Sequence, residues 1–396
     1  MANVSSSNGL EKRPRLRFPG FDEPYKQCRI GDIYAERSQR GASDMELLSV
    51  TMNDGVKPRS EIEGKDNSSE DKSNYKIVRK GDMVYNSMRM WQGANGISPC
   101  DGIVSPAYTV LMPKQEINNG YFAALFKSVT LINEFRKNSQ GMTSDTWNLK
   151  YPQIETIKVQ IPSVSEQDKV SELFSVLDER IATQAQLDES LKKYKRGVSD
   201  YLFLQNTKMP IHCKWKQFSF GDVVEINPKT PPLPEQFIYI DLECVESGQL
   251  KSLNYINKNH APSRAQRVLC RNDVLFQMVR PYQKNNYLYR DIFDVPVVAS
   301  TGYAQIRCSE CNPFFVYEQI SSEQFSREAM MRSTGTGYPA INADGLAQIP
   351  FYVPTPEEQE KIGVFLSALG AKIAKESEIL AALDIIKKAL MQQLFT

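Results

Sequence analysis

An internal repeat constrains the fold of this chain more than any other feature. The segment "IPSVSEQDKVSELFSVLDERIA" at 161–182 returns as "VPTPEEQEKIGVFLSALGAKIA" at 353–374. Residues 154–203 align with 346–395 at a constant offset of 192 residues and without a gap. An ungapped match of this length indicates an internal duplication. The identical pairs include Pro162/Pro354, Glu166/Glu358, Gln167/Gln359, Lys169/Lys361, Leu177/Leu369, Ile181/Ile373, Leu191/Leu383, Lys195/Lys387 and Phe203/Phe395.

Each copy carries the signature of a helix start. Ser163 and Thr355 each precede a glutamate by three residues, Glu166 and Glu358, which is the spacing of a capping box. Pro356 stands at the first helical position of the second copy, where its missing N–H removes no hydrogen bond. The sequence therefore predicts that a helix begins near residue 164 and another near 356.

Apolar residues recur every three or four positions beyond each start, and this spacing predicts two helices of ~38 residues, or ~57 Å. A helix of that length with one apolar stripe needs another helix against it, and the duplicate is the obvious partner. We expect Leu177, Ile181, Leu369 and Ile373 in the seam between them. The stripes are Val170, Leu173, Leu177, Ile181, Leu191, Tyr194, Val198 and Tyr201 in the first copy, and Ile362, Phe365, Leu369, Ile373, Leu380, Leu383, Ile386, Leu390 and Leu394 in the second.

The remainder of the chain is duplicated more faintly. "YKQCRIGDI" at 25–33 matches "WKQFSFGDV" at 215–223, and "GDMVYNSMR" at 81–89 matches "NDVLFQMVR" at 272–280. Short β-rich runs followed by a helical stretch in each half predict two α+β domains with irregular sheets. The expected plan is a disordered tail at 1–14, domain 1 at 15–161, a helix at 162–205, domain 2 at 206–353 and a helix at 354–396.

Composition narrows the class of protein. The chain is 41% hydrophobic and 24% charged, with a net charge of +1, which excludes a simple polycation that coats nucleic acid. No apolar run approaches the ~18 residues of a membrane span, and the polar start has no signal-peptide core. Seven cysteines without regular spacing suit a reducing compartment. We therefore expect a cytoplasmic protein.

Motifs for catalysis are weak or absent in the sequence. "NPKTPP" at 227–232 is a scrambled version of an amino-methyltransferase motif, and no phosphate-binding Gly-x4-Gly-Lys-Ser/Thr exists. Asp54, Glu63 and Lys65 could be imagined as a Mg²⁺ nuclease site, but they lie in a polar loop where solvated charges are expected. Cys308 and Cys311 form one Cys-x-x-Cys pair, for which further zinc ligands would have to come from scattered residues. Those residues are His212, Cys213 and His260.

The order of domain, "P…EQ" helix, domain and "P…EQ" helix, with "LRFPGF" at 16–21 and a "QQLF" ending, resembles the specificity (S) subunit of type I restriction–modification enzymes. The resemblance implies two target-recognition domains, each reading half of a bipartite double-stranded DNA site. It also implies an antiparallel coiled coil of the two helices, giving a pseudo-two-fold repeat that carries two methyltransferase (modification) subunits and is joined by restriction subunits. The S subunit itself would be non-catalytic, with S-adenosylmethionine, ATP and Mg²⁺ held by its partners.

Two other classes of function stay open. One is a standalone sequence-specific DNA-binding regulator, and the other is a nuclease or methyltransferase in its own right. Both copies of the helix repeat Glu-Gln, Lys and further residues that a seam does not require, which favours equivalent partner subunits over a lone regulator.

Candidate DNA contacts come from two segments in each domain. An Asp-led apolar strand ends in Arg89 or Arg280, and amide side chains follow; Arg can bond guanine in a fork, and Asn or Gln can pair with adenine. The alternative is that both arginines merely brace a strand end or pair with a nearby carboxylate. The candidates are Arg89, Gln92 and Asn95, then Thr143, Ser144 and Lys150 in domain 1, and Arg280, Gln283 and Asn285, then Arg332, Thr334, Thr336 and Tyr338 in domain 2.

Overall fold

The computed structural model describes residues 14–41, 44–52, 55–66, 68–143, 147–203 and 215–395. It divides into two compact units, Met1–Gln184 with Ile379–Thr396, and Ala185–Glu378. We call the globular part of the first unit domain 1 and that of the second domain 2. The candidate Ser144 lies outside the described residues, as do Asp54, His212, Cys213 and most of the predicted N-terminal tail.

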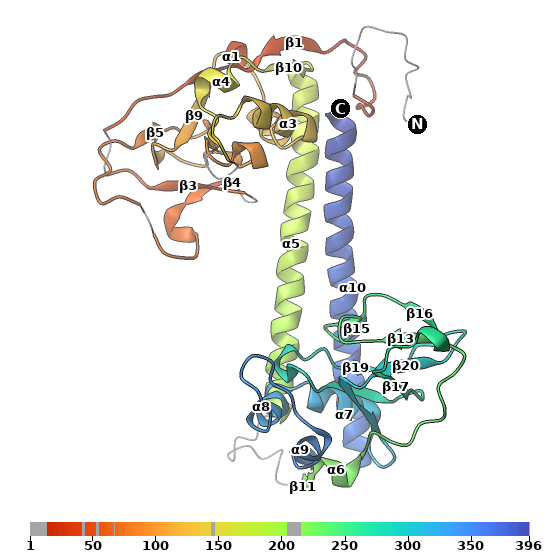
Figure 1. Ribbon diagram of the computed structural model, residues 1–396. Helices are drawn as coiled ribbons and strands as arrows, with labels where there is room; N and C mark the ends of the chain where they lie inside the picture. Colours follow the sequence, from red (N-terminus) through yellow and green to blue (C-terminus); the bar gives the residue numbers. More distant parts are fainter. Residues whose placement is uncertain are drawn as a thin grey trace. The chain divides into compact units, whose positions relative to one another are not determined.

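Domain 1 is built on a four-stranded antiparallel sheet in the order β2-β9-β6-β7 (Figure 1). Smaller pairs β1-β10, β3-β4 and β5-β8 surround it. The strands are β1 (Lys26–Arg29), β2 (Tyr34–Glu36), β3 (Leu48–Thr51), β4 (Gly55–Pro58), β5 (Lys76–Val78), β6 (Met83–Asn86), β7 (Asn95–Ile97), β8 (Gly102–Val104), β9 (Tyr108–Pro113) and β10 (Lys158–Ile161). The short helices are α1 (Ile30–Ile33), η1 (Arg59–Glu61), η2 (Met90–Gln92), α2 (Asn119–Leu125), α3 (Val129–Asn138) and α4 (Tyr151–Ile154).

Domain 2 repeats this plan. Its sheet β12-β21-β18-β19 corresponds strand by strand to the main sheet of domain 1, and β11-β22 corresponds to β1-β10. A second four-stranded sheet has the order β16-β13-β20-β17. The strands are β11 (Lys216–Ser219), β12 (Glu225–Ile226), β13 (Gln236–Ile240), β14 (Val245–Glu246), β15 (Gln249–Leu250), β16 (Asn254–Asn257), β17 (Ala265–Val268), β18 (Val274–Gln277), β19 (Tyr287–Leu288), β20 (Val297–Ser300), β21 (Tyr303–Arg307) and β22 (Pro350–Val353). The short helices are α6 (Phe220–Val223), η4 (Lys258–His260), η5 (Pro281–Gln283), α7 (Pro313–Ile320), α8 (Glu323–Met331) and α9 (Ala343–Ala347).

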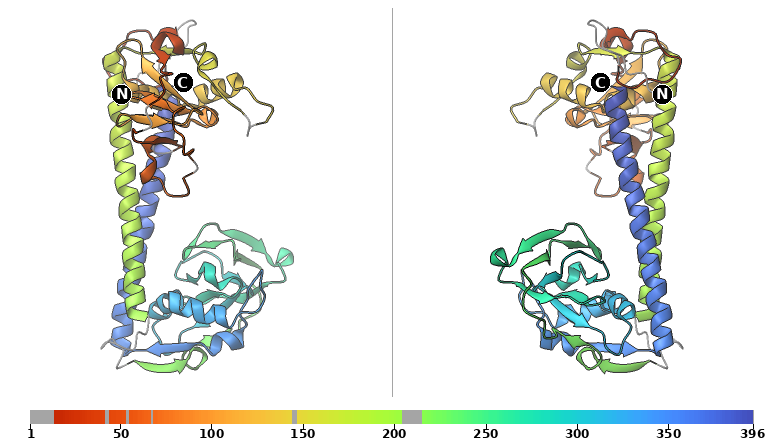
Figure 2. Two further views of the ribbon diagram at one scale, coloured as in Figure 1. Left: turned by 90° about the vertical axis from the view of Figure 1, so that its left-hand side faces the viewer. Right: turned by 90° about the vertical axis from the view of Figure 1, so that its right-hand side faces the viewer.

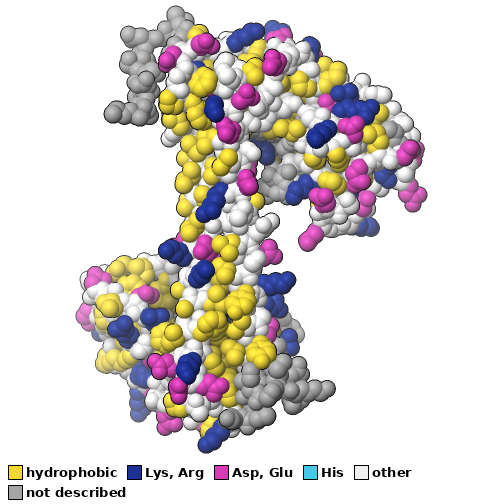
Figure 3. Space-filling view, turned by 180° about the vertical axis from the view of Figure 1, so that it is seen from behind, with side chains coloured by type: hydrophobic (Ala, Val, Ile, Leu, Met, Phe, Trp, Pro, Cys, Tyr) yellow, Lys and Arg dark blue, Asp and Glu magenta, His cyan; other side chains and the backbone are white. Residues whose placement is uncertain are grey.

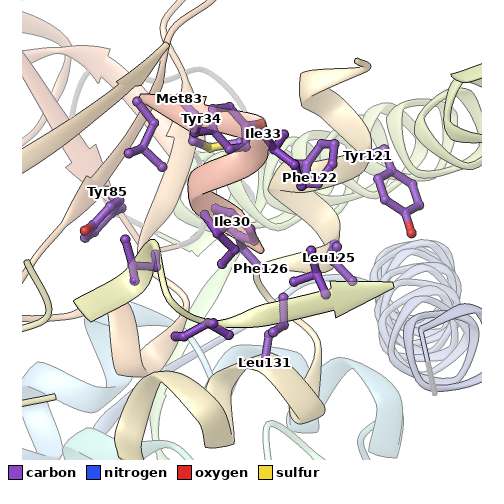
Figure 4. Packing of buried hydrophobic residues seen from close by; sticks show 14 of the residues in the cluster. Ile30, Ile33, Tyr34, Met83, Tyr85, Tyr121, Phe122, Leu125, Phe126 and Leu131 are labelled. Atoms are coloured by element: carbon purple, nitrogen blue, oxygen red, sulfur yellow. The ribbon is translucent and has the colours of Figure 1, made fainter. Parts of the chain in front are cut away.

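The core of domain 1 is aromatic, and Figure 4 shows its centre. Tyr34 meets the ring of Phe122 edge-on with centroids 5.5 Å apart, and Phe126 meets Phe135 in the same manner at 5.6 Å. Such edge-to-face pairs stabilise a core beyond the area they bury. Tyr121 lies at the margin beside α10, where its ring is 5.5 Å from that of Phe395. The core therefore joins the sheet to the end of the last helix.

The repeated Asp of the two strand motifs holds a turn. Asp82 and Asp273 are buried, and each accepts a hydrogen bond from the backbone N–H three residues earlier, at 2.8 Å and 2.7 Å. An arginine bonds both oxygens of each carboxylate: Arg37 for Asp82 and Arg307 for Asp273. A buried carboxylate needs such pairing, so these two aspartates have a structural role at the starts of β6 and β18.

The two long helices are α5 (Val164–Phe203) and α10 (Pro356–Leu394), of 40 and 39 residues. In the first unit, Phe174 of α5 stacks on Phe395 just beyond the end of α10, and Asp178 pairs with Lys387. In the second unit, Ser377 of α10 donates a 2.6 Å hydrogen bond to Asp188 of α5. Residue numbers rise along α5 while they fall along α10, so the helices pair antiparallel in each unit, side by side in both Figure 1 and Figure 2. The predicted pairing of the copies is confirmed.

The seam follows a stricter spacing than the apolar stripe. Leu177, Ile181, Leu369 and Ile373 are half-buried, as expected for seam positions. The seam of α5 then continues through residues spaced alternately by three and four, and these include buried polar side chains. They are Gln184, Asp188, Leu191, Lys195, Val198 and Leu202.

Four stripe residues are exposed instead, and the prediction was wrong for them: Tyr194, Tyr201, Phe365 and Ile386. These residues occupy the heptad column beside the seam, which an apolar pattern by itself does not distinguish from the seam.

The helix starts also differ from the predicted capping boxes. Thr355 accepts from the Glu358 backbone N–H at 3.4 Å, and α10 begins at Pro356 as expected. The glutamate side chains are used elsewhere. The buried Glu166 carboxylate accepts two hydrogen bonds from Arg17, at 3.0 and 2.6 Å, and Glu358 accepts from the Trp215 indole at 3.2 Å. Partners distant in sequence replace the local cap.

Candidate nucleic-acid interface

In domain 2 the chain leaves β18 through a strained turn. Arg280 has a φ of 54° and Lys284 a φ of 53°. Both residues therefore lie in the left-handed region, which residues other than glycine rarely adopt. Between them lies η5, closed by a 3.0 Å hydrogen bond from the Gln283 N–H to the Arg280 carbonyl. The buried Gln277 amide donates to the Val279 carbonyl and to the Gln283 side chain, both at 2.8 Å. The turn is therefore held from inside the domain.

A hairpin at 334–340 packs on this turn. Thr334 and Ala340 exchange backbone hydrogen bonds of 2.9 Å in both directions, and Gly335 supplies a φ of +92° at the bend. The Arg280 N–H donates to the Pro339 carbonyl at 2.7 Å. The two candidate segments of domain 2, distant in sequence, thus form one surface, which we call the turn–hairpin surface of domain 2: residues 280–283 with 334–340.

Arg280 is seated on an aromatic ring of this surface. Its guanidinium carbon lies 4.3 Å from the centroid of the Tyr338 ring, and Tyr338 is 71% exposed. No carboxylate of the described residues pairs with Arg280. Its cationic edge is thus free for a ligand while the aromatic face restricts its motion.

Domain 1 has the same construction. The chain leaves β6, passes Arg89 and η2, and turns at Gly93 with a φ of 87°. A hairpin closed by Gln140 and Asn148 packs on it, and the Leu149 N–H donates to the Ser87 carbonyl at 2.9 Å. Domain 2 has the equivalent bond from Ile341 to Met278 at 3.0 Å. The turn–hairpin surface of domain 1 comprises residues 89–92 and the described part of 140–148.

An aromatic cluster on this surface was missed from the sequence. Trp91 and Trp147 meet edge-on at 5.2 Å, and the guanidinium carbon of Arg136, from α3, lies 5.5 Å from the Trp91 ring centroid. The Trp91 indole N–H donates to the Met88 carbonyl at 3.0 Å. Two of the three tryptophans in the chain, Trp91 and Trp147, lie close in sequence to the candidate DNA contacts of domain 1. This proximity was the sequence signal that could have indicated the cluster.

The candidates differ in how much they can offer a ligand. Asn95 is fully buried and donates to the Gly93 carbonyl at 3.0 Å, so this candidate was wrong: its strand β7 turns the side chain into the domain. Arg332, at the C-cap of α8, donates to the carboxylate and the carbonyl of Glu328. Asn285 is half-buried, and its side chain accepts from the Ser247 N–H at 3.4 Å. The exposed candidates are Arg89, Thr143, Lys150, Gln283, Thr334, Thr336 and Tyr338, whereas Gln92 and Arg280 are half-buried.

The described residues hold no cluster of three or more His, Cys, Asp or Glu side chains suited to a metal. Burial raises the pKa of Cys308 to about 12, and the neighbouring Cys311 adds to the shift. Among the described segments, no helix is both long and apolar enough to span a bilayer.

The chain matches the family described as "Type I restriction modification DNA specificity domain" twice, over residues 23–193 and 213–384. It therefore belongs to that family, as a two-domain specificity subunit. Subunits of this class recognise DNA within a complex and are non-catalytic; the enzymatic activities lie in partner subunits.

Individual relatives agree with the family match. The chain is 22% identical over 345 residues to the type I restriction enzyme MjaVIII specificity subunit of Methanocaldococcus jannaschii, covering 81% of this chain and 79% of that protein. It is 25% identical over 195 residues to the HindI specificity subunit of Haemophilus influenzae, covering 46% of this chain and 40% of that one.

Solved structures share the fold. The S subunit of a type I restriction–modification system from M. genitalium superposes with a TM-score of 0.62 at 15% identity, over 97% of this chain and 99% of that one. A chain from a study of complex assembly and conformational transition of the type I system gives 0.55 at 15% identity, over 96% and 99%.

Proposed function

We propose that this chain reads a bipartite double-stranded DNA target, one half with domain 1 (15–161) and the other with domain 2 (206–353), through their turn–hairpin surfaces. The observation that carries the proposal is the recurrence of one construction in both domains: a strand end, a 3₁₀ turn and a hairpin that present an arginine and amide or hydroxyl side chains. The side chains differ between the domains, so the two half-sites differ in sequence.

The residues proposed to contact DNA are those that remain accessible. Arginine and amide side chains can read base edges in the major groove, whereas hydroxyls and lysines suit phosphates and sugars. They are Arg89, Gln92, Thr143 and Lys150 in domain 1, with Arg280, Gln283, Thr334, Thr336 and Tyr338 in domain 2. A net charge of +1 fits a subunit whose partners supply part of the contacts to the DNA phosphates.

The partners proposed are two methyltransferase subunits, bound to the long helices, with restriction subunits completing the endonuclease in the cytoplasm. S-adenosylmethionine, ATP and Mg²⁺ belong to these partners. Leu187, Tyr194 and Tyr201 recur every seven residues along one exposed column of α5. Tyr194 is 56% exposed, and its equivalent in the repeat, Ile386 of α10, is 49% exposed. Hydrophobic side chains gather over the long helices on the face shown in Figure 3. The two positions related by the repeat, Tyr194 and Ile386, are both exposed and apolar, which suits two copies of one partner helix.

The recognition proposal is tested by methylation mapping. The chain is co-expressed with its modification subunits, and methylated adenines are mapped across a genome for the wild type and for Arg280→Ala. A base-reading Arg280 changed to Ala should cost ~1–3 kcal/mol and relax one position of the second half-site alone. Unaltered sites, or equal loss at every sequence, would contradict a base-reading role.

The docking proposal is tested by gel filtration with the modification subunit. Tyr194→Asp and Ile386→Asp place a charge on each column and should each remove one bound subunit without unfolding the chain. Ser190→Asp and Ala382→Asp, exposed positions elsewhere on the same helices, are the matched controls. Retention of both subunits by the two column variants would refute docking at Tyr194 and Ile386. A wild-type chain that binds no modification subunit would favour the standalone regulator.

A further inference from the structure

Each turn–hairpin surface carries one arginine over an aromatic ring, but the two arginines come from different elements. In domain 2 Arg280, at the turn itself, lies over Tyr338 of the hairpin. In domain 1 the seated arginine is Arg136 of α3, which lies over Trp91 of the 3₁₀ turn, and Trp91 in turn packs on Trp147 of the hairpin. None of the described aromatic rings lies under Arg89, the sequence equivalent of Arg280.

A seated guanidinium differs physically from a free one. An exposed arginine loses much side-chain freedom when it forms a forked pair with guanine, and an aromatic face that already restricts the side chain reduces this loss. The guanidinium carbons of Arg280 and Arg136 lie 4.3 Å and 5.5 Å from their ring centroids, within the range of a cation–π contact. Seating therefore favours base reading over the less directional contact with a phosphate.

The element that carries each residue distinguishes Arg136 from Arg89. Both are exposed, and neither forms an ion pair with any carboxylate that the structure describes. Arg136 is carried by a helix whose start is capped by Ser128 and whose inner face is buried through Leu131 and Phe135. Arg89 lies at the N-cap of η2, where none of the described aromatic rings or carboxylates pairs with its side chain. Domain 1 thus restricts the side chain of Arg136 more than that of Arg89.

Resting on the proposed function, we propose that the base-reading arginine of domain 1 is Arg136 rather than Arg89, and that Tyr338 and Trp91 are positioning residues for Arg280 and Arg136. The expected target is a guanine in each half-site. Arg89 is left with a phosphate contact, which adds affinity but no sequence preference.

The test maps methylation and measures duplex binding for the full chain in complex with its modification subunits. The duplex carries the wild-type target. Arg136→Ala should relax one position of the first half-site and lower affinity roughly 5- to 150-fold at that target. Arg89→Ala should leave the recognised sequence unchanged, weaken all sequences alike and reduce the slope of log K against log salt by about one.

The positioning role has its own readout in domain 2. Tyr338→Ala should relax the same base position as Arg280→Ala, whereas Tyr338→Phe, which keeps the ring face, should retain the wild-type sequence. Tyr255→Ala removes another exposed tyrosine, from β16, and is the matched control for stability. Equal behaviour of Tyr338→Ala and Tyr338→Phe would overturn the positioning role.

Failure of this inference is distinguishable from failure of the proposed function. If Arg89→Ala relaxes a base position and Arg136→Ala does not, or if Arg136→Ala weakens all sequences alike, the assignment of Arg136 is wrong while bipartite recognition stands. If the wild-type complex methylates no bipartite sequence, the proposed function itself is wrong, whatever the arginine variants show.

Discussion

At the scale of single residues, the repeated Gln of the "EQ" motif docks each domain on its own helix. Gln167 accepts from the Asn118 N–H at 3.0 Å and donates to the Pro162 carbonyl at 3.0 Å. Gln359 makes the same bonds with Asn312, at 2.9 Å, and with Pro354, at 3.1 Å. Both glutamines are buried. Their repetition reflects an internal joint rather than a partner surface, which corrects the interpretation of the Glu-Gln repeat from sequence.

Glu318 is a residue whose ionisation affects stability. It is buried on α7, and Lys195 of α5 donates to it at 3.0 Å. Burial raises the pKa of Glu318 above its ordinary value of 4.5, although the charge of Lys195 offsets part of the shift. The folded state therefore holds this proton more tightly than the unfolded chain does. The stability contributed by Glu318 is complete below about pH 4.5 and is lost as pH rises through the folded-state pKa.

Glu318→Gln should remove this loss. Urea unfolding at a series of pH values from about 4 to 8 should show the free energy of unfolding falling more with pH in the wild type than in the variant. Glu310→Gln, at an exposed site in the same domain, is the control. Parallel curves for wild type and Glu318→Gln would contradict this role.

At the scale of elements, each domain packs one of its helices closely on its own long helix, with small and large residues exchanged between the copies. A Cβ on Gly120 of α2 would lie 2.1 Å from the Ser171 Oγ of α5. In the second copy the small residue is on the long helix: a Cβ on Gly363 would lie 2.8 Å from both the Phe314 Cβ and the Phe315 backbone N. The short helix of each half therefore fits the long helix of its own half. Against the long helix of the other half it would clash or leave a gap.

Gly363→Ala should lower the free energy of unfolding by roughly 1 kcal/mol or more, because the clash involves backbone that cannot move cheaply, and overpacking costs more than the helix gains from alanine. In the first copy, Gly120→Ala should be destabilising alone and should recover when Ser171→Gly is added. Thermal unfolding of the three variants measures this. Equal loss in the single and double variants of the first copy would contradict the proposed fit.

Leu369→Asp tests the seam of α10. The side chain is half-buried against α5, so a carboxylate there would lose hydration without gaining a partner. We expect a loss of roughly 2 kcal/mol or more and impaired assembly with the modification subunits. Ala368→Asp, at the exposed neighbouring position, should be tolerated. Normal folding and assembly of Leu369→Asp would refute its place in the seam.

At the scale of the whole molecule, duplication makes each half incomplete by the same amount. The first unit takes its second helix from Ile379–Thr396, whose Phe395 packs on Tyr121 and Phe174. The second unit takes its second helix from the end of α5, whose Phe203 packs on Phe315 and Trp215. Phe203 and Phe395 are the same position of the repeat. Each half is thus completed by a segment that the other half also contains.

A chain ending at residue 205 should therefore form a dimer in which the end of α5 of each copy replaces the missing end of α10, and it should recognise a symmetric site. Asp188 would lose its bond from Ser377 there, so Asp188→Leu, which introduces the residue of the repeat equivalent Leu380, should strengthen the dimer. Light scattering measures the mass, and methylation mapping measures the site. A stable monomer would refute the expectation.

The sequence by itself determined the duplication, the two long helices and their approximate ends, because helix periodicity and start signals are local and an ungapped repeat records its own register. It placed the ends of β6 and β18 at Arg89 and Arg280, three residues beyond their observed ends at Asn86 and Gln277. Tertiary structure decided what those signals could not. It turned Asn95 inward, bound Arg332 to Glu328 and seated Arg136, from a helix more than 40 residues away in sequence, on Trp91. Side-chain direction depends on packing between segments distant in the chain, and a single sequence records no such packing.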